Sequence, residues 1–129
     1  MAHKSSLIGG ASESLAKAIF MANGFTVFEP VVPEPYDIIV FTQSHSSKKI
    51  SFSIQIKTIK WRKDDDYDSR MVIRGAPNSG VPYSKDDVDY ILGIDLQSAK
   101  GYLIPNNEQL EYTAINTEVA KTKWTELTL

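Results

Sequence analysis

The 129-residue sequence contains no cysteine and only two histidines, His3 and His45. Without cysteine the chain has no disulfide bond, no thiolate zinc site and no cysteine nucleophile. Neither histidine has an acid or a second histidine at ligand spacing, so we expect both to be exposed rather than to bind a metal. The sequence also lacks a G-x-x-x-x-G-K-[ST] phosphate loop, a dinucleotide fingerprint and a nucleophile elbow.

Long hydrophobic runs and a large net charge are absent as well. No apolar run approaches the roughly 20 residues that span a membrane, and residues 1–7 lack the apolar core of a signal peptide. We therefore expect an intracellular, cytoplasmic protein. The formal net charge is −2, which argues against a strongly basic protein that coats nucleic acid. The length fits one domain, residues 1–129, and no repeat or long linker divides it.

The charges are unevenly distributed along the chain. Residues 48–74 carry eight basic and four acidic side chains, a net charge of +4, whereas the remaining residues carry a net charge of −6. The eight basic residues are Lys48, Lys49, Lys57, Lys60, Arg62, Lys63, Arg70 and Arg74. This segregation indicates either a localised basic surface or chance clustering on a solvated face.

The pattern predicts a helix first, from about Leu7 to Asn23. One apolar face at helical spacing is formed by Leu15, Ala18, Ile19 and Ala22. Ser5 or Ser6 could cap the start of this helix. Gly24 suits the left-handed position that ends a helix, and Phe25 can fold back onto the last turn.

The rest of the chain is predicted to be mainly strands. We expect strands at 25–28, 37–41, 49–59, 71–73, 90–94 and 101–104, and loops at 42–47, 60–74 and 78–82. Ser84 can cap a single helical turn over 85–88, and a short helix is expected at 117–123. One helix before a run of strands predicts an α/β fold with a mixed β-sheet flanked by helices.

Four polar residues could carry chemistry: Glu13, Asp37, Gln55 and Lys57. Asp37 opens an apolar strand, and the side chains of Gln55 and Lys57 leave one face of a later strand. A hairpin between these strands would bring a carboxylate, an amide oxygen and an ammonium together, with Glu13 reaching from the helix. Oxygen ligands suit Mg²⁺, which acidifies a bound water for attack on phosphorus. A lysine beside it stabilises the developing charge.

Each of these residues also has a purely structural interpretation. An Asp at the start of a strand is commonly a turn residue, and Gln or Lys on a polar strand face is commonly solvated. Glu13 lies early in a helix, where an acid complements the helix dipole. The spacing of Gln55 and Lys57 favours the functional interpretation, because it keeps both side chains together.

The motifs around these residues resemble the PD-(D/E)XK nuclease superfamily. They are Gly10-x-x-Glu13, Gly24-Phe25-x-Val27, Pro35-Tyr36-Asp37-Ile38-Ile39-Val40 and Ile54-Gln55-Ile56-Lys57-Thr58, followed by Tyr83-Ser84-x-x-Asp87-Val88-Asp89-Tyr90-Ile91 and Tyr102-Leu103-Ile104-Pro105. They are most similar to the small branch of resolvase-like nucleases and a group I intron homing endonuclease with Gln in the metal-site motif. The resemblance covers about residues 9–105. Tyr36 and Gln55 depart from the superfamily pattern, and Gln55 removes one negative charge.

The resemblance implies a restriction-endonuclease-like core and Mg²⁺-dependent hydrolysis of DNA phosphodiester bonds, with Mn²⁺ as a substitute. Asp37 matches the metal-binding Asp, Gln55 the acidic position, Lys57 the motif lysine and Glu13 the helix-borne acid. All four are then candidate catalytic residues, and Asp37, Gln55 and Glu13 are candidate metal ligands. The branch also implies a gene carried by a phage or a mobile element.

The basic residues after the motif lysine gain a meaning from this resemblance. We expect DNA phosphate contacts from Lys60, Arg62, Lys63, Arg70 and Arg74, backbone contacts from Tyr83 and Ser84, and stacking by Trp61 and Tyr67. The acidic triplet 64–66 is expected in a solvated turn. One small site cuts one strand, so the resemblance favours a homodimer or homotetramer.

Two alternatives stay open at this point. One is a catalytically inactive DNA-binding module on the same fold, with Gln55 as the mark of lost activity. The other is an unrelated protein-interaction domain, in which Asp37, Gln55 and Lys57 do not converge.

Overall fold

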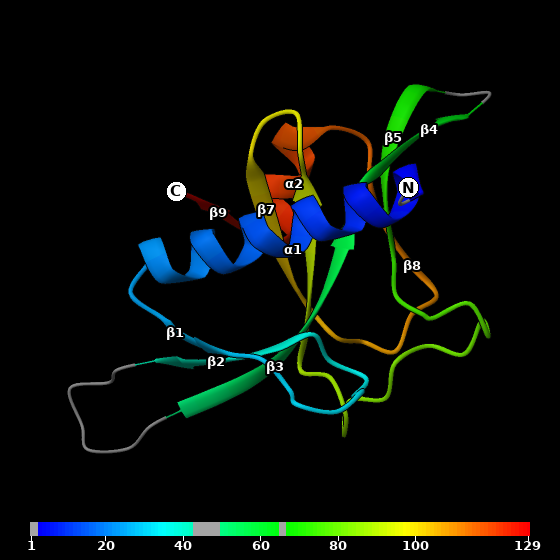
Figure 1. Ribbon diagram of the computed structural model, residues 1–129. Coiled ribbons are helices and arrows are strands. Elements are labelled where there is room, and N and C mark those ends of the chain that lie inside the picture. Colours follow the sequence, from blue (N-terminus) through cyan, green and yellow to red (C-terminus); the bar gives the residue numbers. More distant parts are fainter. Residues whose placement is uncertain (1–2, 43–49, 65–66) are drawn as a thin grey trace.

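The computed structural model describes residues 3–42, 50–64 and 67–129 (Figure 1). His45, most of the loop expected at 42–47, and Asp65 and Asp66 lie outside the described residues. The elements are α1 (Lys4–Ala22), β1 (Thr26–Phe28), β2 (Ile38–Thr42), β3 (Ile50–Thr58), β4 (Lys60–Asp64), β5 (Tyr67–Arg74), β6 (Tyr90–Asp95), β7 (Lys100–Pro105), β8 (Glu111–Ala114), α2 (Thr117–Lys123) and β9 (Thr125–Thr128).

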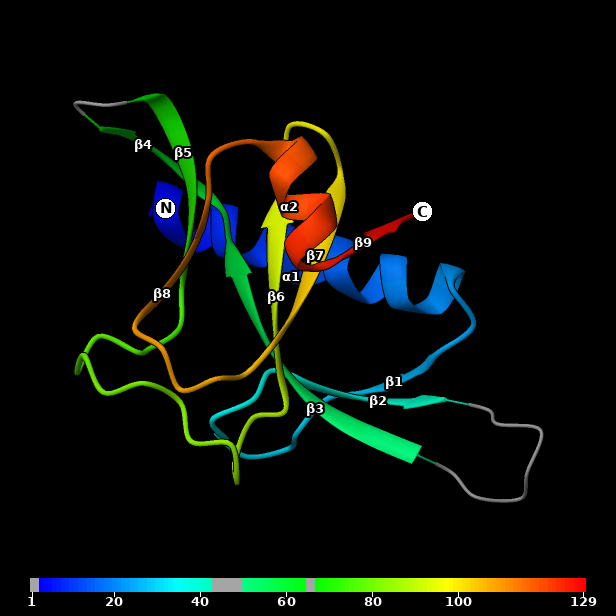
Figure 2. The same cartoon turned by 180° about the vertical axis from the view of Figure 1, so that it is seen from behind.

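Two sheets organise these strands. The central sheet has the order β1-β2-β3-β6-β7-β9, and β4, β5 and β8 form a second sheet. Strands β3 and β6 run parallel, whereas the other neighbours in the central sheet are antiparallel. Helix α1 covers one face of the central sheet, and α2 lies on the opposite face (Figures 1 and 2). The predicted α/β fold, a mixed sheet flanked by helices with the N-terminal helix first, is therefore confirmed.

The face that α1 buries differs from the predicted stripe. Its buried residues are Ser12, Ala16, Ile19 and Phe20. Of the expected set, Ile19 is buried and Leu15 packs partly buried against the same cluster. Local sequence does not separate the two overlapping stripes in this alanine-rich helix. Packing of the large Phe20 ring under the sheet decides between them. The start also differs, because His3 occupies the N-cap without a side-chain hydrogen bond, in place of Ser5 or Ser6.

The end of α1 confirms the prediction at Gly24. Gly24 has a φ of +88° and its N–H donates to the Met21 carbonyl at 3.0 Å. The Phe25 N–H donates to the Phe20 carbonyl at 3.0 Å, which together with the first bond forms a Schellman motif. The rings of Phe20 and Phe25 meet edge to face, 5.5 Å apart. This contact directs the chain from α1 into β1.

The prediction of a loop at 60–74 is wrong, because residues 60–64 and 67–74 form the antiparallel strands β4 and β5. Strand β8 pairs with β5 and completes the second sheet. Met71, Val72 and Ile73 are all buried, and the exposed Arg74 ends this run. A short, continuous apolar run of β-branched and large residues is consistent with a buried strand. Strands β8 and β9 were not predicted, since β5 and β7, which pair with them, lie far away along the chain.

The remaining predicted elements are present with small shifts of their ends. The strands expected at 25–28, 37–41, 71–73, 90–94 and 101–104 correspond to β1, β2, β5, β6 and β7, and β3 covers 50–58 of the strand expected at 49–59. Helix α2 lies at 117–123 as expected. Ser84 accepts a hydrogen bond from the Asp86 N–H at 3.1 Å and begins a single turn. Within the described residues, no helix is long and apolar enough to cross a membrane.

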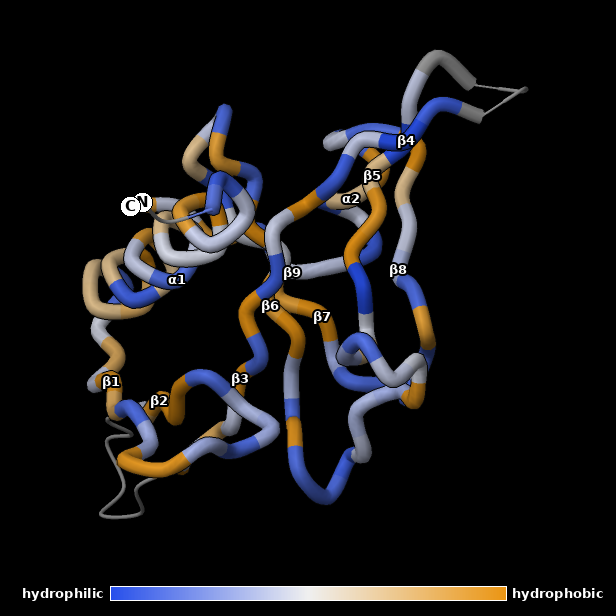
Figure 3. The backbone as a smooth tube through the Cα atoms, turned by 45° about the vertical axis from the view of Figure 1, so that its right-hand side comes forward, coloured by the Kyte–Doolittle hydropathy of each residue, from blue (hydrophilic) through white to orange (hydrophobic). Residues whose placement is uncertain are grey.

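The core consists of two apolar clusters, one on each face of the central sheet. One lies between α1 and the sheet, and includes Phe20, Ile54 and Ile56. The other lies between the central sheet, α2 and the second sheet, and includes Ile59 and Ile73. Figure 3 shows apolar β6 and β7 between α1 on one side and β4, β5 and β8 on the other. The two sheets and α1 therefore enclose the residues at the end of β3.

Gly93 in β6 is the place where the second sheet approaches the central one. A Cβ atom at Gly93 would lie 2.7 Å from Ile73 Cδ1 and 3.2 Å from Ile59 Cγ1. In α1, by contrast, a Cβ atom at Gly10 would have no atom within 4 Å. The same substitution should therefore have opposite effects at these two positions.

We expect Gly93→Ala to lower the free energy of unfolding by about 1–3 kcal/mol, because the added methyl overpacks the contact between the sheets. Gly10→Ala should raise it by about 0.5–1 kcal/mol, because alanine favours an open helical site. Urea denaturation followed by circular dichroism measures both. A Gly93→Ala variant as stable as the parent protein would contradict this packing.

Candidate active site

The site lies at a fork in the central sheet, defined as the point where β2 stops pairing with β3. The pairing of β2 with β3 ends at Ile38 and Ile54, whereas β6 accompanies β3 to Thr58. The Asp37 N–H donates to the Ile54 carbonyl at 2.9 Å. Asp37 Oδ2 accepts the Ile56 N–H at 2.8 Å. The carboxylate thus satisfies a backbone donor that β2 leaves without a strand partner.

Gln55 and Lys57 project from the same stretch of β3. Both are partly buried, and they lie opposite Ile91 and Gly93 of β6. Ile54 and Ile56 alternate with them and are buried under α1. The Gln55 Nε2 atom lies 3.5 Å from the carbonyl oxygen of Ile56. The alternation predicted for this strand therefore places the amide and the ammonium on one side.

Glu13 reaches the fork from α1. The hydroxyls of Ser12 and Thr58 lie 2.6 Å apart, and this contact fixes the first half of α1 against the end of β3. Glu13, the next residue, lines the cavities on both sides of α1 together with Ile56. Ser12 was not singled out from the sequence, although its spacing from Ala16 and Ile19 matches a buried helix face.

The electrostatics of the two acids are coupled. Burial raises the pKa of the Asp37 carboxyl, an effect that the Ile56 N–H and the Lys57 ammonium partly oppose. Desolvation and then the charge of Asp37 raise the pKa of Glu13, whereas Lys17 lowers it. Asp37 and Glu13 therefore both resist ionisation, and a cation bound between them would stabilise their ionised forms.

The structure therefore brings Glu13, Asp37, Gln55 and Lys57 together around one fork. Asp37 and Gln55 share one cavity, Asp37 and Glu13 share a second, and Glu13 and Lys57 share a third. The unrelated protein-interaction domain required that Asp37, Gln55 and Lys57 be apart, and this arrangement removes its premise. Within the described part of the chain, no three acidic or histidine side chains form a group that could hold a metal ion.

A groove of about 640 Å³ lies between α1 and the second sheet. Register places a set of basic residues on the sheet face toward this groove, here called the basic face: Lys60, Arg62, Arg70 and Arg74. Lys60 and Arg74 line the groove itself, as does Lys57. Two acids, Glu13 and Glu111, also line the groove, and Glu111 pairs with Arg62 at 3.2 Å. This ion pair was not predicted from the sequence, because β8 was not expected.

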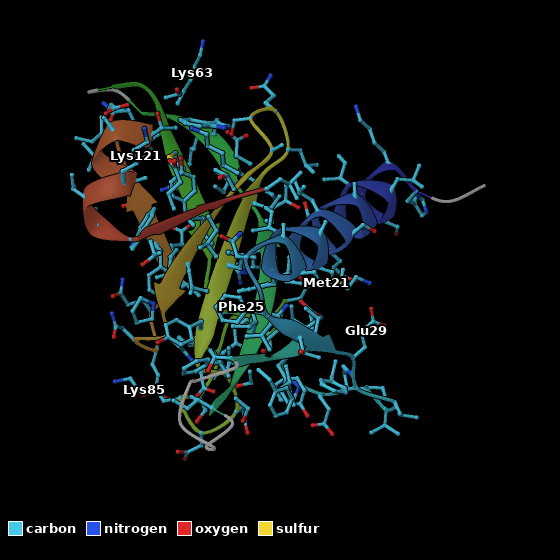
Figure 4. The ribbon with its side chains drawn as sticks, turned by 90° about the vertical axis from the view of Figure 1, so that its left-hand side faces the viewer. Met21, Phe25, Glu29, Lys63, Lys85 and Lys121 are labelled. Carbon is cyan, nitrogen blue, oxygen red and sulfur yellow. The ribbon has the colours of Figure 1, made fainter. Side chains whose placement is uncertain are left out.

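The other predicted DNA contacts lie around this face. Lys63 points away from the body of the molecule (Figure 4). Trp61 pairs with Met71 across the hairpin, so it lies on the opposite side from the basic face. Tyr83 and Ser84 line a cavity of about 610 Å³ on the other side of Gln55. The basic groove and this cavity thus flank the fork from two directions.

The cavity that Asp37 and Glu13 share has a volume of about 440 Å³. Its lining includes Glu29 and Glu34 from the segment between β1 and β2, next to Glu13 and Asp37. Lys17 pairs with Glu29 here. Acidic residues thus dominate this cavity, whereas basic residues dominate the groove, and the fork lies between the two. A phosphate therefore favours approach along the groove, whereas a cation favours the acidic side.

No family model matches the chain, and no curated protein matches its sequence. Among solved structures, its fold is similar to that of a bacterial homing endonuclease, I-Ssp6803I, with a TM-score of 0.65. The two sequences are 16% identical, and the match covers 90% of this chain and 78% of that chain. This likeness shows the fold. The restriction-endonuclease-like architecture expected from the sequence motifs is thereby confirmed, while the Gln-x-Lys site stays a prediction.

Proposed function

We propose that this protein is a metal-dependent DNA endonuclease of the PD-(D/E)XK type, with its active site at the fork. The observation that carries the proposal is the convergence of Asp37, Gln55 and Lys57 at the end of β3, beside a basic groove. The fold that the chain shares with a homing endonuclease supports it.

The donor set fits a hard divalent cation. Asp37, Glu13 and the amide oxygen of Gln55 are the residues that would hold Mg²⁺ or Mn²⁺, which prefer oxygen ligands. When bound, the metal would supply a Lewis acid and an acidified water. Burial raises the pKa of both the Asp37 and the Glu13 carboxyl, and a cation held between them would lower both values by favouring the charged forms.

The chain's own residues perform the other steps in this proposal. The basic face binds backbone phosphates and places one of them at the fork. The Lys57 ammonium stabilises the negative charge that develops on the phosphate in the transition state. Asp37, anchored by the Ile56 N–H, keeps the ligands in place without movement of β3. Two or four copies would be needed to cut both strands, which is the basis for a proposed homodimer or homotetramer.

The primary test is cleavage of plasmid and branched DNA with Mg²⁺ or with EDTA. We expect nicking or linearisation with Mg²⁺ or Mn²⁺ and none with EDTA. Lys57→Ala should lower kcat about 100-fold or more, because it removes a charge that acts in the transition state. Lys121→Ala, at an exposed position of α2, is the matched control and should cut normally. Cleavage that survives EDTA or the loss of Lys57 would exclude this mechanism.

An inactive DNA-binding module is the second candidate, and Gln55 is the observation that favours it. A neutral amide binds Mg²⁺ less strongly than a carboxylate, and the described residues lack a group of three acids. The two candidates share the fold, the groove and the basic face. They differ in whether the residues at the fork catalyse cleavage of DNA.

Gln55→Glu separates these candidates. In an attenuated nuclease, the added charge should strengthen metal binding, so the Mg²⁺ concentration for half-maximal cleavage falls several-fold. Gln97→Glu, in the turn between β6 and β7, adds the same charge elsewhere and should leave that concentration unchanged. A titration of Mg²⁺ in the plasmid assay measures the difference. Binding without cleavage in both the parent protein and Gln55→Glu would favour the inactive module.

The basic face predicts how DNA binding responds to salt. Lys60→Ala removes one groove charge, so the slope of log Kd against log salt concentration should fall by about 1. Lys121→Ala removes the same charge from α2 and should not change the slope. Fluorescence anisotropy of labelled duplex DNA in EDTA measures both without cleavage. Equal slopes for Lys60→Ala and the parent protein would place the DNA elsewhere.

A further inference from the structure

The ammonium of Lys57 lies over an aromatic ring. Its Nζ atom is 5.3 Å from the centroid of the Tyr83 ring, which lies within the range of a cation–π contact. Lysine has a long, flexible stem, and an ammonium at its end samples many positions in water. Tyr83, which lines the cavity that Asp37 and Gln55 share, restricts these positions.

Tyr83 is itself held by its backbone. Its N–H donates to the Gly75 carbonyl at 3.1 Å, and its carbonyl accepts from Asn106 Nδ2 at 3.0 Å. Gly75 follows β5, and Asn106 follows β7. The ring packs against the apolar cluster that includes Ile59. Elements that meet only in the folded protein therefore fix the Tyr83 ring.

Asn106 is the centre of this arrangement. It is 5% exposed, and its Nδ2 also donates to the Val88 carbonyl at 2.9 Å. Its Oδ1 accepts from the Glu108 N–H at 2.9 Å and from the Tyr112 hydroxyl at 3.3 Å. All four hydrogen bonds of the amide are thus made. A buried and fully bonded amide of this kind holds the segment from Tyr83 to Val88 at both ends.

Gly75 adds a steric constraint at the same place. A Cβ atom at this position would lie 2.2 Å from the Gln109 carbonyl oxygen and 2.7 Å from Tyr112 Cε2. The backbone that receives the Tyr83 N–H therefore lies directly on the segment that carries Asn106 and Tyr112. The two backbone partners of Tyr83, Gly75 and Asn106, are therefore both closely packed.

We propose that Tyr83 is a positioning residue for Lys57: its ring holds the ammonium at the fork, and the Asn106 amide holds the ring. The sequence suggested only a DNA backbone contact for Tyr83. This inference rests on the proposed function, in which Lys57 acts on the phosphate. Restricting the lysine before DNA arrives favours turnover rather than binding.

Two substitutions separate positioning from DNA contact. Tyr83→Phe keeps the ring and removes the hydroxyl, so cleavage should stay within about twofold of the parent protein. Tyr83→Leu removes the ring, so kcat should fall about tenfold while KM for DNA changes less than about twofold. A Tyr83 that served only as a phosphate contact through its hydroxyl would give a raised KM in both variants, and that outcome overturns the proposal.

A second measurement does not require activity. In the nuclear magnetic resonance spectrum of the DNA-free protein, the Lys57 ε-protons should show a ring-current shift and contacts to the Tyr83 ring protons. The shift should persist in Tyr83→Phe and disappear in Tyr83→Leu. Tyr90→Leu is the control, because Tyr90 packs on Phe52 with 5.3 Å between ring centroids and should leave the Lys57 signals unchanged. Absence of these contacts in the parent protein overturns the proposal even if Tyr83→Leu does not fold.

Lys57→Ala, assayed in parallel, keeps the two proposals distinguishable. If Lys57→Ala cuts as well as the parent protein, the proposed function fails. If Lys57→Ala is inactive but Tyr83→Leu keeps the kcat of the parent protein, the nuclease stands and the positioning role fails. A loss of kcat in Tyr83→Leu with rescue in Tyr83→Phe supports both.

Discussion

The hydrogen bond from the Ile56 N–H to Asp37 Oδ2 is the interaction on which the site depends. Two neighbouring strands normally satisfy each other's backbone groups along their whole length. Here β2 leaves β3 early, and a side chain takes over the next bond. Because the Asp37 side chain replaces a backbone acceptor of β2, the edge of β3 is open to solvent and a carboxylate is fixed beside it. Gln55 and Lys57 become accessible for the same reason, because β2 no longer continues along this edge.

The groove next to the fork follows from the way in which the two sheets meet. Gly93 lies opposite Lys57 in β6, and the absence of a side chain there lets Ile73 of the second sheet pack closely. Because this face of β5 packs on the core, the opposite face, which carries Arg70 and Arg74, lies toward α1. A packing contact in the core thus determines where positive charge lies on the surface.

Charge separation across the fork reconciles the net charge of −2 with the proposed action on DNA. The acids near Asp37 and the bases of the second sheet occupy different sides of one site. Glu111 moderates the positive side through its ion pair with Arg62. Such a site attracts a phosphate locally, whereas the net charge of the whole protein does not favour tight binding to any nucleic acid.

The sequence alone determined the features that depend on neighbouring residues. The end of α1 at Gly24, the alternation of β3 and the common side of Gln55 and Lys57 follow from backbone conformation and side-chain period. The convergence of Asp37 with Gln55 was also predictable, since a hairpin links them. The basic residues after Lys57 were visible as a cluster, although not as a strand.

Only the tertiary structure decided which face of α1 is buried, how residues 60–74 pair, and what lies over Lys57. Two overlapping apolar stripes in α1 differ little in hydrophobicity, so the sheet selects one of them. Strand β5 gains β8 as a partner from the other end of the chain, and Tyr83 is held by Asn106 in the same way. These features depend on contacts between residues far apart in sequence, and no local pattern encodes such contacts.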